Sequence, residues 1–111
     1  MNIIEAIAAE IEPYEQSMAS IEKSLIDAGT RFKPFMSTDE YSEEARKTVA
    51  LASMLCLSRM LSLSSENAGG FSQSYDTKRL EDRIKSIAES AGISPDLVLK
   101  DNSENIYCIH I

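Results

Sequence analysis

The sequence predicts a mainly α-helical protein, a small bundle of about four helices that forms a single helical domain over residues 1–111. Apolar residues recur at spacings of three and four in several stretches, which is the period of an amphipathic helix. The chain has 111 residues, of which 43% are hydrophobic, and this suffices for one core. Only 6% are aromatic and none is Trp, so the core must be aliphatic.

Two short helices are expected within the first 28 residues. The first carries apolar residues at 3, 4, 7 and 11 and should end before Pro13, because the residue before a proline disfavours the helical conformation. The second should end at Ala28 with Gly29 just beyond it. One bent helix also fits, but we predict two segments. The apolar residues of the second pattern are Tyr14, Met18, Ile21, Leu25 and Ala28.

A connector over residues 30–41 should lead into the central helix. It breaks the helical period at Pro34, and its anchors onto the core should be Phe32, Phe35 and Met36. Ser42 is the expected N-cap of the next helix, with Asp39 as the rival cap. This next helix is apolar around most of its circumference, which is typical of a buried central element. Its stripe and flanks are Ala45, Val49, Ala52, Cys56 and Met60, with Leu51, Leu55, Leu57 and Leu61.

The last long helix should begin with Asp76 or Thr77 as its cap and end at Gly92. A single turn should follow, with Ser94 as cap and Pro95 at the first helical position. The inward residues of the long helix should be Leu80, Ile84, Ile87, Ala88 and Ala91.

A minor two-stranded β element completes the predicted fold. Residues 64–76 (SSENAGGFSQSYD) form a loop or arm between the last two long helices, and within it Phe71 and Tyr75 alternate with serines. The tail at 105–111 is β-branched and aromatic, so it should be a strand. A short strand needs a partner, and we predict pairing of 71–75 with 106–111. The glycines at 69 and 70 alternatively begin a projecting arm that contacts a neighbouring subunit.

The sequence gives no signal for an enzyme, a cofactor or a metal site. Gly69-Gly70 lacks the lysine that a phosphate-binding loop requires. His110 is the only histidine and lies next to the last residue. Cys108 and His110 would leave one face of a strand, but a structural zinc site needs four ligands. The acidic run at Asp39, Glu40, Glu43 and Glu44 is better explained by helix capping and the helix dipole.

Charge is distributed unevenly along this acidic chain, whose net charge is -7. Residues 1–28 contain six acids and one base, whereas residues 29–63 contain five bases and four acids. No basic stripe is present to neutralise phosphates, so sequence-specific nucleic-acid binding is not expected. The uneven charge permits head-to-tail contact between copies. Cys56 lies in an apolar run, where a free thiol acts as a small hydrophobe, and the N-terminus does not look like a signal peptide, so we expect a cytoplasmic protein. No apolar stretch is long enough for a membrane span, so we expect no membrane partner.

The order of features resembles a known family. Two short N-terminal helices, "SIEKSLIDAG", a long helix beginning "EYSEEARKTVALA", then "GGFSQSYD" and a last helix are similar to the small α-helical head–tail connector (adaptor) proteins of tailed phages and prophages. The resemblance covers roughly residues 15–92 and leaves the segment 93–111 unmatched. It implies a non-enzymatic structural protein that oligomerises, as a ring between portal and tail components, in the bacterial host or the virion.

These observations lead to one functional expectation and one alternative. We expect a prophage connector-like assembly subunit whose partners are itself and other phage structural proteins. The alternative is a small adaptor or regulatory module that binds a partner protein through an exposed helix face, which would need an uncovered apolar patch around Ile3, Ile4 and Ile7. The expected subunit-contact residues are Gly69, Gly70, Phe71, Ser72, Gln73, Ser74 and Tyr75.

Overall fold

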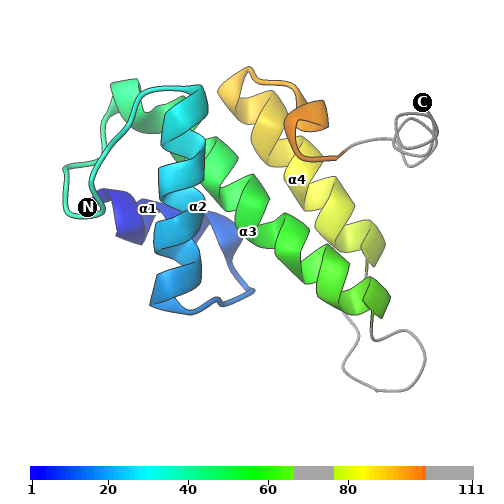
Figure 1. Ribbon diagram of the computed structural model, residues 1–111. Coiled ribbons are helices and arrows are strands. Elements are labelled where there is room, and N and C mark those ends of the chain that lie inside the picture. The colour runs from blue at the N-terminus through cyan, green and yellow to red at the C-terminus, as the bar shows by residue number, and fades with distance from the viewer. Residues whose placement is uncertain (67–76, 100–111) are drawn as a thin grey trace, which may run out of the picture.

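Four α-helices form one compact all-α domain in the computed structural model, which describes residues 1–66 and 77–99 and, in 62–66, the backbone alone (Figure 1). No strand occurs in these ranges; only an isolated antiparallel bridge joins Asn2 to Glu40. The predicted pairing of 71–75 with 106–111 lies outside the described residues. The helices are α1 (Ile3–Ile11), α2 (Met18–Arg31), α3 (Arg46–Glu66) and α4 (Thr77–Ala91), with 3-10 turns η1 (Glu43–Ala45) and η2 (Pro95–Leu97).

Helix α3 is the central element, as predicted. It packs against α1, α2 and α4, and Figure 1 shows it between α2 and α4. Ala52, Cys56 and Leu57 on it have no exposed surface, whereas Leu55 and Leu61 are partly buried against the core. A helix that contacts three neighbours must be apolar on most sides, and this explains why its sequence lacks a polar face.

Helix α1 forms where the isoleucine spacing predicted it. Asn2 caps it, since the Asn2 side chain accepts from the Glu5 backbone N–H and the Glu5 carboxylate accepts from the Asn2 N–H. Ile3, Ile7 and Ile11 are at most 1% exposed, so one whole stripe of this short helix lies in the core. The helix stops before Pro13, as expected.

Helix α2 differs from its predicted bounds at both ends. It begins at Met18, where Ser17 accepts from the Ser20 N–H, and Met18 itself is 63% exposed instead of inward-facing. It continues to Arg31, so Gly29 lies inside the helix and not beyond its end. A Cβ on Gly29 would lie 3.0 Å from the Pro34 Cα. The glycine therefore serves close packing of the connector against α2 and not helix termination.

The connector after α2 folds back along α1. The Ile4 N–H donates to the Ser37 carbonyl and the Ile3 N–H to the Asp39 carbonyl. Phe32 and Phe35 pack on the core as predicted, but Met36 is 69% exposed, so that predicted anchor is wrong. Asp39 caps a local turn by accepting from the Met36 N–H, and is not the cap of α3.

The segment before α3 also departs from expectation. Ser42 stands at the cap position of the η1 turn, but its side chain makes no capping hydrogen bond there. The α-helix proper then starts at Arg46, one turn after Ser42. A helical turn therefore begins directly after Ser42 as predicted, but the capping hydrogen bond is absent and the α-helix itself starts one turn later.

Helix α4 and the turn after it follow the sequence signals closely. Leu80, Ile84, Ile87 and Ala88 are buried. The chain leaves the helix at Gly92, whose φ of +75° is a conformation that glycine adopts without steric cost. Ser94 then accepts from the Asp96 N–H, and Pro95 begins η2. The end of α4 at Gly92 and the Ser94–Pro95 turn are confirmed. Ala91, also predicted to face inward, is partly buried. Thr77 is the first residue of the helix, and Asp76, the other predicted cap, lies outside the described residues.

Three arginines connect helices that are distant in sequence, and the sequence analysis missed them. Arg83 on α4 donates to the Glu10 carbonyl of α1 at 2.9 Å. Arg46 donates to the Ser90 carbonyl of α4 at 2.7 Å, and Arg59 to the Ser20 carbonyl of α2 at 3.1 Å. Glu10 and Ser90 lie in the last turns of their helices, where carbonyls lack helical partners and a positive charge is favourable.

Candidate functional site

The predicted subunit-contact residues, Gly69 to Tyr75, lie outside the described residues. Their boundaries are nevertheless defined by the helices on either side. Helix α3 continues through Glu66, so residues 64–66 of the predicted loop or arm are helical. Helices α3 and α4 pack together, and Figure 1 shows that α3 ends and α4 begins at the same end of this pair.

The start of α4 gives that segment a fixed base. Leu80 lies in the first turn of α4 and has no exposed surface. Arg83, in the second turn, holds the end of α1 through the Glu10 carbonyl. The start of α4 is therefore anchored to the core within one turn of Thr77.

A second candidate surface is a groove of about 620 Å³ between α1, the α1–α2 linker and the start of α2, which we call the α1–α2 groove. Its size is within the range of pockets that bind ligands and side chains, about 300–1,000 Å³. Gln16 fixes the linker beside it by donating to the Cys56 carbonyl of α3 at 3.0 Å. The apolar lining comes from Ile4, Ala8, Ile11, Pro13, Tyr14, Met18 and Ile21.

The rim of the α1–α2 groove is acidic. Glu5, Glu12 and Glu15 line it and are exposed, and no lysine or arginine is among its lining residues. The sequence had pointed to an apolar patch at Ile3, Ile4 and Ile7, but Ile3 and Ile7 are completely buried in the monomer. Only Ile4 of that patch reaches the groove. The groove could not be predicted from the sequence, because it depends on the angle at which α1 and α2 cross, and residue spacing does not determine that angle.

Cys56 and the acidic residues before α3, which the sequence analysis considered, have structural roles. Burial raises the pKa of the Cys56 thiol, an effect that the Ser24 hydroxyl and the Arg59 charge only partly oppose. This buried thiol therefore stays protonated near neutral pH. In the predicted capping cluster, Glu43 pairs with Arg46 at 3.3 Å and Glu44 with Lys33 at 3.1 Å. Cys108 and His110 lie outside the described ranges.

Two kinds of feature are absent from the described residues. Within residues 1–66 and 77–99, no three His, Cys, Asp or Glu side chains gather in a way that could hold a metal ion. Over the same ranges no helix is both long enough and apolar enough to cross a membrane. The features that stand out are therefore the α3–α4 end and the α1–α2 groove.

Fold and surfaces together define a compact four-helix domain with two candidate contact surfaces. The chain belongs to DUF6706, a family of unknown function, whose match covers residues 1–107. No curated protein and no solved structure matches the chain.

Proposed function

We propose that this protein is a non-enzymatic assembly subunit, similar to the head–tail connectors of phages and prophages, that acts by oligomerisation. Its partners are further copies of itself and other phage structural proteins, such as portal or tail components. It would act in the bacterial host cell or in the virion. It needs no cofactor for this role.

The observation that carries the proposal is the placement of the helix ends on either side of residues 67–76. Two short helices and a long central helix form a compact body, and α3 ends where α4 begins, at one end of the α3–α4 pair (Figure 1). Leu80, the one buried residue in the first turn of α4, holds the start of this helix against the core. This is the layout on which the resemblance to connector proteins rests, and it suits a contact segment carried by a rigid body.

Gly69 to Tyr75 remain the proposed contact residues. Pairing of 71–75 with 106–111, within one subunit or between neighbours, is the finer part of the proposal. A short strand with an open edge offers backbone donors and acceptors to a second chain. The acidic charge of the chain is compatible with a ring around DNA, because such a ring must let the duplex pass without gripping it.

The test is the solution mass of the wild type and of Phe71→Ser/Tyr75→Ser, measured by light scattering over a concentration series. We expect the wild type to associate and the double variant to lose association while its melting temperature stays unchanged. Ile26→Ser is the matched control, because Ile26 is an apolar side chain 65% exposed on α2. A wild type that stays monomeric at every concentration contradicts the proposal. If the variant assembles normally, the contact lies elsewhere.

The alternative function is a small adaptor or regulatory module that binds a partner protein through an exposed helix face. The apolar patch that it was expected to need is not uncovered, because Ile3 and Ile7 are buried. The α1–α2 groove supports the alternative instead, since it is an apolar depression on the N-terminal helices. A gene position beside portal or capsid genes would favour the connector function instead. A monomeric protein encoded away from such genes would favour the adaptor.

A further inference from the structure

We infer that the α1–α2 groove is the docking site for a second copy of this chain, and that the docking segment is residues 31–36, Arg-Phe-Lys-Pro-Phe-Met. We call this segment the basic connector. The inference rests on the proposed self-association and names the two surfaces that would meet. The arm at 69–75 is not part of either surface.

The chemistry of the basic connector matches that of the groove. Residues 28–38 contain Arg31 and Lys33 and no acid, whereas the groove carries three carboxylates and no base. Arg31 and Lys33 are exposed, and Met36 is 69% exposed. An apolar floor with an acidic rim accepts an apolar side chain flanked by positive charges.

Intramolecular contacts leave the basic connector available. The Lys33 ammonium lies 5.5 Å from the centre of the Phe35 ring and 3.1 Å from a Glu44 carboxylate oxygen. The Lys33 and Glu44 side chains are 58% and 73% exposed, and pairs this exposed are weak, worth about 0–1 kcal/mol at most. Lys33 can therefore exchange Glu44 for a carboxylate on another copy at little cost.

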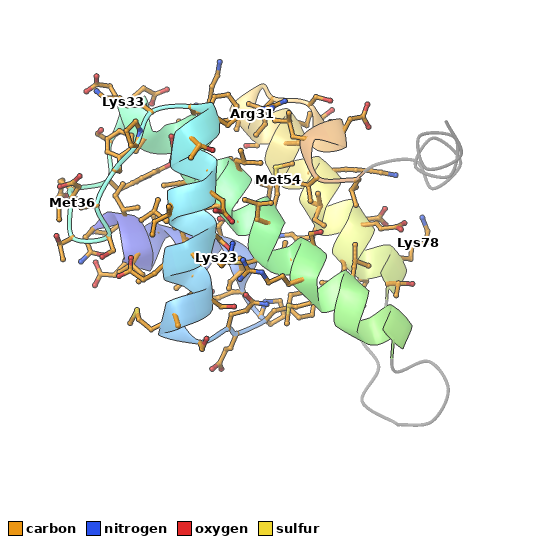
Figure 2. All side chains as sticks on the ribbon, in the orientation of Figure 1. Lys23, Arg31, Lys33, Met36, Met54 and Lys78 are labelled. Carbon is orange, nitrogen blue, oxygen red and sulfur yellow. The ribbon has the colours of Figure 1, made fainter. Side chains whose placement is uncertain are left out.

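The charged residues of the two surfaces lie at opposite ends of α2, so Arg31 and Lys33 cannot pair with Glu12 and Glu15 within one copy. Met36 lies beside α1 instead, since the next residue, Ser37, accepts from the Ile4 N–H. The groove includes Met18, the first residue of α2, and Arg31 is its last. At 1.5 Å per residue these positions are about 20 Å apart along the helix. Figure 2 shows Arg31 and Lys33 at the end of α2 away from the α1–α2 linker.

A contact between two different surfaces has a structural consequence. Each copy presents one groove and one basic connector, so each can bind two neighbours, one at each end of α2. Such head-to-tail contacts generate a ring if the rotation between copies closes, and an open chain otherwise. The acidic residues 1–28 and the more basic middle of the chain would alternate around that assembly.

Two charge-reversal variants test the inference. Glu12→Lys/Glu15→Lys makes the rim basic and leaves Glu5 to its capping bond. Arg31→Glu/Lys33→Glu makes the connector acidic. Each variant alone should associate at least tenfold more weakly than the wild type in sedimentation velocity at low salt. An equimolar mixture should associate again, because both possible groove–connector contacts between the two variants are then complementary.

The control is Glu81→Lys/Glu89→Lys, which makes the same charge change at exposed positions of α4. It should leave association within about twofold of the wild type. Raising the salt concentration should weaken wild-type association, because exposed charge pairs are screened. Circular dichroism of each variant shows whether it is folded.

Two results would overturn the inference. One is unchanged association of a folded rim or connector variant, and the other is a mixture that stays dissociated although both variants are folded. If these variants assemble normally while Phe71→Ser/Tyr75→Ser does not, the proposed function stands and the groove is not its interface. A wild type that is monomeric at every concentration would contradict both the inference and the proposed function.

Discussion

Replacing Arg83 by Met should destabilise the fold by removing the bond that caps α1 from another helix. Helix α1 has no basic residue in its own last turn. Each of its last three backbone carbonyls has a different donor. The Ala9 carbonyl accepts from the Glu12 N–H and the Ile11 carbonyl from the Tyr14 N–H. The Glu10 carbonyl accepts from the Arg83 guanidinium at 2.9 Å. The last of these bonds joins residues 73 positions apart in sequence.

The size of the effect follows from the partners and their exposure. A hydrogen bond from a charged donor contributes about 1.5–3 kcal/mol. The Arg83 side chain is 39% exposed, so water replaces part of that bond when Arg83 is removed. We therefore expect a loss of about 1–2 kcal/mol, which lowers the melting temperature of a domain this size by about 4–8 °C. Met keeps an unbranched apolar stem of similar length.

Thermal unfolding followed by circular dichroism at the helical band measures this loss. Lys85→Met is the matched control, since Lys85 is exposed on the same helix, and it should change stability by less than about 0.5 kcal/mol. Glu10→Gln separates the two contacts of Arg83. It keeps the carbonyl and removes the carboxylate, which lies 3.8 Å from the guanidinium and is 41% exposed. A cost for Glu10→Gln equal to that of Arg83→Met would refute the capping argument and assign the effect to the ion pair.

Two further predictions concern positions inside the bundle. Gly29→Val should destabilise the protein by about 1–3 kcal/mol in chemical denaturation, because the new Cβ would lie 3.0 Å from the Pro34 Cα. The control Ala19→Val, at an exposed site on α2, should cost only about 0.5 kcal/mol. An equal cost for both variants would contradict the close packing of Gly29 against Pro34. In a Cys108→Ser background, Cys56 should resist alkylation in the native state from neutral pH to above the ordinary thiol pKa of about 8.5, because burial raises its pKa. It should react at once in denaturant, and rapid native labelling would mean that the α2–α3 interface opens.

Features that depend on a few neighbouring residues could be predicted from the sequence. The isoleucine spacing of α1, the end of α4 at Gly92 and the Ser94–Pro95 turn are of this kind. The central position of α3 could also be predicted, because a helix without a polar face has to be surrounded. These features need no knowledge of which helix meets which.

Features set by contacts between distant residues could not be predicted. Gly29 has the sequence context of a helix end, and only the packing of Pro34 explains why it lies inside α2. Met36 has the composition of a core anchor, yet the turn closed by Asp39 leaves it in solvent. The α1–α2 groove has the same origin, since its lining comes from two helices whose crossing is fixed by α3.

The Arg83 contact also links the two candidate surfaces. Arg83 lies in the second turn of α4, near the start of that helix. Its partner Glu10 is the neighbour in sequence of Ile11, which lines the groove. Loosening this contact should therefore disturb both surfaces at once without changing a contact residue of either. If Arg83→Met loses assembly together with a lower melting temperature, the loss is due to a less stable helix bundle. Loss of assembly in Glu12→Lys/Glu15→Lys at an unchanged melting temperature would report the groove itself, so stability and assembly must be measured on the same preparations.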